Sequence, residues 1–356
     1  MKFNFEEHVK SQSFSKEQIK YLLEHCDDES LRNEIASYAR KVADEVYGKA
    51  IYMRGLVEFS NYCHNDCYYC GIRCSNQNVQ RYRLTKEEIL ECFDEGYQLG
   101  FRSFVMQSGE DFSYKDEDLC EIITKMKQKY ADCALTLSIG EKSFDSYQKY
   151  KQCGVDRFLL RHETINKQHY ELLHPNKMSQ THRLACLKDL KTLGYQVGCG
   201  IMVGSPYQTI EHIVEDIMFM KQFDPHMIGI GPFIPHHQTP FKDFKQGSLN
   251  LTLMILSIVR IMLPNVLLPS TTALGSIHEY GRELGILAGC NVVMPNLSPY
   301  SVRKQYSLYD NKRCMGDEAA EGLALLKSEM QEIGYEVVTD RGDFPKEELG
   351  RRGVRA

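Results

Sequence analysis

The decisive stretch of this sequence is Asn61–Arg73, which reads NYCHNDCYYCGIR. Its cysteines, Cys63, Cys67 and Cys70, follow the spacing C-x3-C-x2-C, so one short loop can direct three thiolates at a single iron–sulfur centre. Three thiolates leave one iron of a four-iron cube without a protein ligand. Metal sites that keep an open position are the ones that perform chemistry, as the comparison of catalytic with structural zinc sites illustrates. The stretch therefore predicts a reactive [4Fe–4S] cluster.

A zinc site is the alternative, because His64 and Cys74 lie in the same loop as the three cysteines. Structural zinc usually draws on two separated ligand pairs, however, and no second pair is evident elsewhere. Cys74 could instead complete a fully ligated electron-transfer cluster. Such a cluster is normally found in a much smaller protein than this chain of 356 residues.

The composition is that of an ordinary soluble enzyme. The chain is 42% hydrophobic and 26% charged, so it can bury a large core, and its net charge of −5 provides no basic surface for nucleic acid. No apolar run has the length of a membrane span, and the chain does not open with a signal-peptide pattern. Thirteen cysteines without such a signal predict a reducing, cytoplasmic location.

After about residue 50 the sequence alternates between short apolar runs and amphipathic helical patterns. Eight strands alternating with helices predict a parallel sheet, and eight is the number that closes a TIM-type barrel. We expect a complete (βα)8 barrel over 51–310, an N-terminal helical cap over 1–50 and a C-terminal helical extension over 311–356. The predicted strands are Gly55–Ser60, Ser103–Gln107, Ala134–Ile139, Arg157–Leu160, Tyr195–Met202, Met227–Ile230, Leu267–Pro269 and Asn291–Met294.

Capping signals and apolar periodicity define the helices between these strands. Ser15 with Gln18 and Thr85 with Glu88 have the capping-box spacing. Helices are predicted from Ser15 onward, at about Ser30–Tyr47, and at Thr85–Leu99, Glu117–Tyr130, Ser179–Leu193, Ile210–Phe223, Thr252–Met262, His278–Ala288 and Glu318–Ile333.

Each predicted strand is followed by a loop rich in polar or glycine residues. The most polar of these is Arg161-His162-Glu163, which follows an apolar strand and is awkward unless it lines a polar cavity. The active sites of such barrels are built from the loops at the strand C-termini. The sequence therefore predicts one active site at one mouth of the barrel.

Several segments together resemble a known family. The cysteine spacing, with Tyr69 before the last cysteine, resembles the signature of the radical S-adenosylmethionine (SAM) enzymes. In the same order along the chain, further segments resemble the FeFe-hydrogenase maturase family HydE: Arg54–Cys63, Gln107–Asp111, Leu160–Thr164, Gly229–His236 and Pro269–Ala273. The resemblance covers about 51–309.

This resemblance implies a fold, a reaction and partners. It implies a complete barrel related to biotin synthase and methylornithine synthase, one [4Fe–4S] cluster, and SAM cleaved to a 5′-deoxyadenosyl radical. The implied substrate is a small organometallic iron complex carrying carbon monoxide, cyanide and cysteine. The implied partners are the maturases HydG and HydF and a low-potential electron donor.

The resemblance also assigns residues by motif. Cys63, Cys67 and Cys70 would hold the cluster, Glu163 would bind the SAM ribose, and Arg183 the methionine carboxylate. The other cofactor-binding residues would be Tyr69, Gln107, Ser108, Met202 and Ile230. The substrate cavity would use Arg161, Thr271, Thr272 and Tyr306 as catalytic residues, together with Arg54, Met294 and Tyr309. For Tyr306 and Tyr309, a helix packing two aromatic residues one turn apart is the structural alternative.

Two features limit the resemblance. Some HydE sequences carry a second C-x7-C-x2-C cluster near the C-terminus, whereas here Cys314 has no cysteine after it, so a single cluster is expected. Cys74 stands where other members tend to have a basic residue. The alternatives are another biotin synthase-like enzyme, making methylornithine or inserting sulfur, and a non-enzymatic iron–sulfur scaffold.

Overall fold

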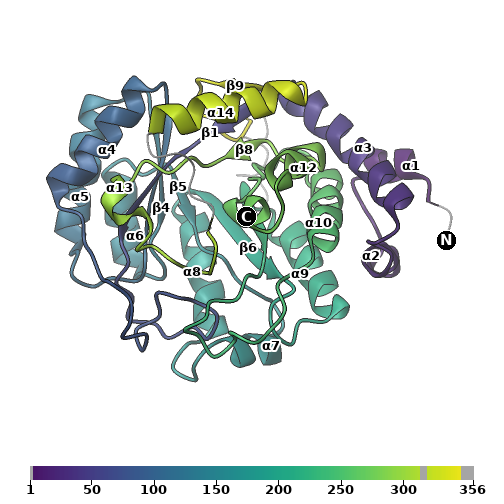
Figure 1. Ribbon diagram of the computed structural model, residues 1–356, viewed down its shortest axis with the longest axis horizontal. Coiled ribbons are helices and arrows are strands. Elements are labelled where there is room, and N and C mark those ends of the chain that lie inside the picture. The colour runs from purple at the N-terminus through teal and green to yellow at the C-terminus, as the bar shows by residue number, and fades with distance from the viewer. Residues whose placement is uncertain (1–2, 313–318, 346–356) are drawn as a thin grey trace.

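The computed structural model describes residues 3–312 and 319–345. Six parallel strands form a continuous sheet in chain order, with the helices that connect them on the outside (Figure 1). Each of these six matches a predicted strand to within two residues at either end. They are β2 (Gly55–Ser60), β3 (Ser103–Ser108), β4 (Ala134–Ser138), β5 (Arg157–Leu159), β6 (Gln196–Val203) and β7 (Met227–Pro232).

The last two predicted strands are irregular. The predicted strand 267–269 forms only isolated parallel bridges, from Leu267 to Met227 and from Pro269 to β8 (Val292–Val293). A further bridge joins Asn296 to Leu56 of β2, so hydrogen bonds continue around the ring where the regular ladder stops. Pro269 has no N–H to donate to a ladder, which limits regular pairing here. The architecture is therefore an α/β barrel of TIM type with an irregular closing segment.

One connecting helix, α4, begins at a predicted capping box. Thr85 accepts a hydrogen bond from the N–H of Glu88, and the Glu88 side chain reaches back to Thr85. The helices that follow the strands are α4 (Lys86–Gln98), α5 (Asp116–Lys129), α6 (Phe144–Gln152), α7 (Lys167–Leu173), α8 (Gln180–Thr192), α9 (Ile210–Phe223), α10 (Leu249–Met262), α11 (Thr272–Ile277) and α12 (Gly281–Leu287). The short helices α6, α7 and α11 were not predicted. None of the described helices is both long and apolar enough to cross a membrane.

Three helices precede the barrel and cover its outer wall. They are α1 (Phe5–Ser11), α2 (Lys16–Glu24) and α3 (Glu29–Tyr47), with α2 against α9 and α3 against α10. The capping box of Ser15 and Gln18 is present at the start of α2, as predicted. Buried Ile35, Ala39 and Val42 form the inner face of α3.

The C-terminal part contributes a strand as well as a helix. After α14 (Ala319–Glu332), β9 (Glu336–Val338) pairs in parallel with β1 (Ala50–Met53), which also pairs with β8. Figure 1 shows α14 along the same edge of the molecule as β1 and β9. Leu323, Leu326 and Met330 of α14 are buried, so one face of this helix packs inward. The C-terminal helix that we expected is present, and the tail additionally contributes β9 to this small sheet.

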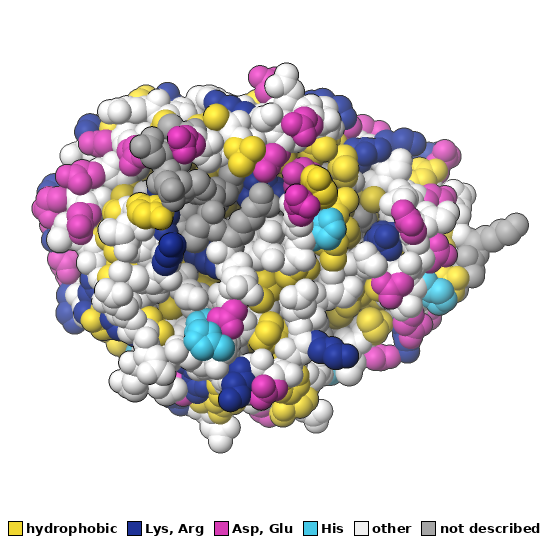
Figure 2. Space-filling model, viewed as in Figure 1, with side chains coloured by type: hydrophobic (Ala, Val, Ile, Leu, Met, Phe, Trp, Pro, Cys, Tyr) yellow, Lys and Arg dark blue, Asp and Glu magenta, His cyan; other side chains and the backbone are white. Residues whose placement is uncertain are grey.

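The surface carries charges of both signs. On the face shown in Figure 2, Lys and Arg side chains alternate with Asp and Glu side chains around the molecule.

Candidate active site

The loop that carries the three cysteines follows β2 and is held by its own polar side chains. Asp66 accepts two hydrogen bonds from Arg73, at 2.7 and 2.6 Å, and one from the Ser75 hydroxyl at 2.7 Å. Arg81 donates to four backbone carbonyls, including that of Asn61. These contacts fix the loop without using a cysteine, so the thiols remain available.

Neighbouring backbone approaches this loop closely. A Cβ atom at Gly109 would lie 2.2 Å from the Tyr62 carbonyl oxygen, and one at Gly71 would lie 2.2 Å from the Ser307 carbonyl oxygen. Only glycine fits at either position, because atoms this close overlap. The cysteine loop therefore packs closely between the segment after β3 and the segment around Ser307.

Burial suppresses ionisation of the three thiols. It raises the pKa of Cys70 to about 12 and that of Cys67 well above its usual value, and neighbouring thiols contribute in the same direction. Burial likewise raises the pKa of Cys63. Thiols in such surroundings are inert until a metal replaces the proton.

The thiol spacing fits a cluster better than a single zinc ion. Within the described part of the chain, the sulfurs of Cys63, Cys67 and Cys70 do not form a group whose members all lie within 4.8 Å of one another. Zinc bound at about 2.3 Å by each sulfur would bring them to about 3.8 Å from one another. This spacing therefore does not match one zinc ion bound by all three sulfurs, whereas a four-iron cube holds its thiolates further apart and does not require them to lie so close.

Tyr69 is held by a histidine that the sequence analysis missed. Its hydroxyl lies 3.1 Å from Nε2 of His174, and Nδ1 of His174 lies 2.9 Å from the Tyr170 carbonyl oxygen. Burial, and secondarily the charge of Arg183, lowers the pKa of His174 to about 3, so this imidazole is neutral. Met202, also predicted, lies in the same apolar cluster as Tyr69.

Glu163 combines backbone strain with an unpaired oxygen. Its φ of +64° is in the left-handed region, which non-glycine residues rarely adopt. The side chain is buried, and its Oε2 lies 3.4 Å from Nη2 of Arg161 without forming a hydrogen bond. Nε and Nη2 of Arg161 are also buried without hydrogen-bond partners. Buried polar atoms in this state mark a place that a ligand can occupy.

Arg183 projects from α8 toward two carboxylates. Its Nε lies 2.8 Å from Oε1 of Glu141 and its Nη2 lies 3.9 Å from Oε1 of Glu110, while Nη1 donates to the Arg161 carbonyl at 3.1 Å. Burial alone would lower the pKa of Arg183. Nearby Tyr170 and the carboxylates raise this pKa by more than burial lowers it, so the guanidinium stays charged. Its charge acts to lower the pKa of Cys67, against the larger effect of burial.

Gln107 and Tyr306 meet across the barrel mouth. Nε2 of Gln107 lies 3.4 Å from the Tyr306 hydroxyl, and the neighbouring Ser108 hydroxyl donates to the Gly109 carbonyl at 2.6 Å. Tyr306 and Tyr309 follow the short helix α13 (Tyr300–Arg303) in an irregular segment. The helical alternative for these two tyrosines was therefore wrong.

The remaining predicted residues lie at different depths in the barrel. Arg54 is buried, with Nη1 2.9 Å from the sulfur of Met227 and with Nε and Nη2 unpaired. It precedes β2 and so lies about 20 Å along that strand from Ser60, at about 3.3 Å per residue. Met294 packs with Met227, and Ile230 is fully buried in the core.

Two threonines follow the irregular seventh segment. Thr271 is the N-cap residue of α11, but its Oγ1 is buried without a hydrogen-bond partner. Thr272 is the first residue of α11. An N-cap threonine normally uses its hydroxyl to cap the helix, so the unpaired Thr271 hydroxyl is available to a ligand.

The chain resembles known proteins over most of its length. The Radical SAM superfamily model matches residues 57–220. The [FeFe] hydrogenase maturase subunit HydE of Thermotoga maritima is 41% identical over 87% of this chain and 88% of its own length. The chain belongs to the HydE family. This radical SAM membership makes it an enzyme.

Other relatives of this HydE-family chain perform other reactions. The 3-methylornithine synthase of Methanosarcina acetivorans is 30% identical over 76% of this chain and 77% of its own length. A crystal structure of methylornithine synthase superposes with a TM-score of 0.81 at 24% identity, covering 94% of this chain and 96% of the other. A crystal structure of HydG superposes with a TM-score of 0.73 at 20% identity, covering 93% of this chain and 78% of the other. These structures support the barrel fold.

Sequence reasoning missed the side chains that position the site. Glu141 and Glu110 face Arg183, and His174 holds Tyr69. Their positions in the sequence could have identified them, because Glu110 and Glu141 each follow a strand, at the end of the barrel where active sites form. Cys314 lies outside the described residues.

Proposed function

We propose that this enzyme binds one [4Fe–4S] cluster through Cys63, Cys67 and Cys70 and uses it with SAM in a HydE-type reaction. The observation that carries the proposal is the convergence of the cysteine loop with the unpaired atoms of Arg161 and Glu163. The charge of Glu163 contributes to the raised pKa of Cys70, so the two side chains are near enough to interact electrostatically, which supports the proposal. When bound, the cluster supplies the electron that cleaves SAM to a 5′-deoxyadenosyl radical.

In this proposal the chain's own residues bind and orient SAM. The Glu163 carboxylate accepts hydrogen bonds from the ribose hydroxyls, and its strained backbone aims it into the barrel. Arg183, with a guanidinium suited to a planar anion, binds the methionine carboxylate. Gln107 and Ser108 face the amino end, and Tyr69, Met202 and Ile230 flank the adenosine.

The proposed substrate is an anionic iron complex carrying carbon monoxide, cyanide and cysteine. Its acceptor groups suit the unpaired donors of Arg161 and Thr271. Thr272 and Tyr306 complete this reacting region, and Arg54, Met294 and Tyr309 bind the substrate from deeper in the barrel and from its mouth. The domains are proposed to be the cap 1–50, the barrel 51–310 and the extension 311–356. HydG, HydF and a low-potential electron donor are the proposed partners.

Reconstitution in a cell-free hydrogenase maturation mixture tests the proposal. We expect hydrogenase activity to appear only when this protein is added, and Arg161→Met to abolish its contribution while keeping the cluster. Absence of rescue by protein with a full cluster and bound SAM would overturn the HydE assignment.

Methylornithine synthesis is the second candidate, favoured by the 30% identical relative. Lysine and SAM incubated with the reduced enzyme should then give methylornithine together with 5′-deoxyadenosine. We expect no methylornithine, because a site for an anionic metal complex and a site for a cationic lysine side chain require opposite charges.

A further inference from the structure

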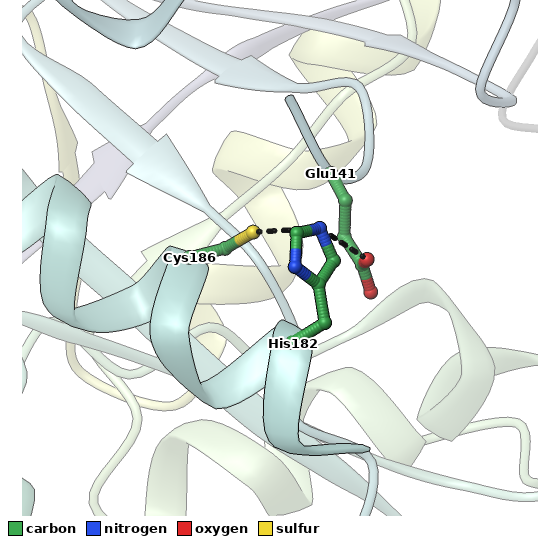
Figure 3. Close-up of side chains that lie close together, drawn as sticks. All are labelled: Glu141, His182 and Cys186. Carbon is green, nitrogen blue, oxygen red and sulfur yellow. Dashed lines mark hydrogen bonds and ion pairs between the residues drawn. The ribbon is translucent and has the colours of Figure 1, made fainter. Parts of the chain in front are cut away.

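A second group of metal-ligand side chains lies beside the active site, on α8 and the loop after β4. His182 and Cys186 are four residues apart on α8, so they occupy the same helix face. Glu141 reaches this face from the loop after β4. Figure 3 shows the His182 ring between the Glu141 carboxylate and the Cys186 sulfur.

The distances within this group match a metal-binding geometry. Nε2 of His182 lies 3.7 Å from Sγ of Cys186 and 3.5 Å from Oε2 of Glu141. A tetrahedral zinc ion, with Zn–S near 2.3 Å and Zn–N and Zn–O near 2.0–2.2 Å, would set these at about 3.6 and about 3.4 Å. All three ligand atoms lie within 4.8 Å of one another. One ion can therefore reach all three with only small side-chain shifts.

A comparison group in the same protein lacks this geometry. His236, His237 and Asp310 also lie within 4.8 Å of one another. There, Nδ1 of His237 is only 2.7 Å from Oδ1 of Asp310, which is a direct hydrogen bond. His182 also contacts its neighbours, through an ion pair with Glu141 at 3.5 Å and a weak hydrogen bond with the Cys186 sulfur at 3.7 Å, but these longer distances are close to those between two ligands of one ion.

The surroundings provide access and charge balance. Glu141 and His182 line a cavity of about 740 Å³, and the His182 side chain is 62% exposed, so an ion and a water molecule can enter. A thiolate and a carboxylate together neutralise a divalent ion. The nearby Arg183 guanidinium contacts the other oxygen of Glu141, Oε1, at 2.8 Å, so Oε2 stays available.

We propose that Glu141, His182 and Cys186 bind one Zn²⁺, with a water from the cavity as the fourth ligand. The Cys186 thiol releases its proton to solvent as the Zn–S bond forms. No electron is transferred, because zinc has no redox chemistry. Through Glu141, the bound ion would also hold Arg183 in place. The zinc site itself does not depend on the proposed function.

Zinc binding to the anaerobic, cluster-loaded protein tests this site. Equilibrium dialysis against micromolar ZnCl₂ measures the stoichiometry, and zinc X-ray absorption counts the sulfur ligands. We expect one zinc with a single sulfur ligand. His182→Ala and Cys186→Ala should each weaken binding by more than about a hundredfold, since even changes outside the ligand set cost 10–100-fold. Iron content should not change.

Control variants separate this site from other thiols. Cys153→Ala removes a cysteine outside this group, at the C-cap of α6, and should bind zinc as the wild type does. His182 is exposed, so His182→Ala tests the ligand without disturbing the core. Equal zinc affinity of His182→Ala and wild type would overturn the proposal. Zinc bound through three sulfurs would also overturn it, because that would place the ion in the cysteine loop.

Discussion

The two ends of strand β5 carry arginines in opposite states. Arg157, at the start of the strand, is fully buried and donates to Ser103, to the carbonyls of Arg341 and Gly342, and to Asp343, at 2.7–2.9 Å. Arg161, just beyond the other end, has two buried nitrogens without hydrogen bonds. The base of the barrel is thus closed by satisfied contacts, and the mouth keeps its donors free for a ligand.

The C-terminal tail accounts for the closed base. Phe344 is fully buried against His226, and Arg341 pairs with both Asp343 and Asp156. Arg54 differs from Arg157, since two of its nitrogens are unpaired. Burial and the nearby charge of Arg157 hold the pKa of Arg54 well below the usual range. The two buried arginines therefore differ: the side chain of Arg157 has hydrogen-bond partners, whereas two nitrogens of Arg54 have none.

The largest expected effect is at the mouth, in the cysteine loop. Cys63→Ser, Cys67→Ser and Cys70→Ser should each lose most of the cluster iron, because two thiolates cannot hold the cube. Anaerobic reconstitution followed by iron analysis measures this, with about four irons expected for the wild type. Cys74→Ser is the matched control and should retain its iron. Full iron in any one of the three variants would remove that cysteine from the ligand set.

The arginine pair tests the comparison directly. Arg157→Met should lower the free energy of unfolding by about 3 kcal/mol or more, because it leaves Asp343 and the tail carbonyls without their donor. Arg161→Met should lower it by clearly less, because the Arg161 side chain loses only one partly exposed ion pair, 3.4 Å from Glu163, and no network of hydrogen bonds. Urea unfolding of both variants measures the difference. Equal destabilisation would contradict the division between base and mouth.

Glu163→Gln should weaken SAM binding without affecting the fold. The amide keeps the shape but loses charge-assisted hydrogen bonds worth about 1.5–3 kcal/mol, so affinity should fall about tenfold or more. Isothermal titration of SAM into the cluster-loaded protein measures this. Unchanged affinity with an intact cluster would show that the strained Glu163 serves another ligand.

The smallest expected effect concerns His174 and pH. Its pKa is about 3 in the folded chain and near 6.5 when unfolded, so the unfolded chain binds more protons between these values. Stability should therefore fall on acidification through this window. Between pH 7.5 and 5.5 the histidine accounts for about 1.4 kcal/mol. His174→Gln should show a pH dependence of unfolding weaker by that amount, and an unchanged dependence would mean that the pKa of His174 is the same in the folded and unfolded protein.

The sequence predicted the regular barrel strands well because their signals are local. An apolar run followed by a polar loop identifies a buried parallel strand whatever its partners are. The same approach placed segment 267–269 correctly between its neighbours, although it forms only isolated parallel bridges, and it missed β9. A three-residue apolar run is ambiguous by itself, and β9 exists only because the tail returns to pair with β1.

The amino-acid sequence alone was enough to predict the cysteine loop, the capping boxes and the alternation of strands with helices. Each of these features depends only on residues within a few positions of one another. Only the tertiary structure decided which polar atoms are satisfied. Arg157 and Arg161 are the same residue type four positions apart, and nothing local distinguishes them. Their states depend on whether a distant segment supplies acceptors: the tail around Asp343 does so at the base, and no described segment completes the hydrogen bonds of Arg161 at the mouth.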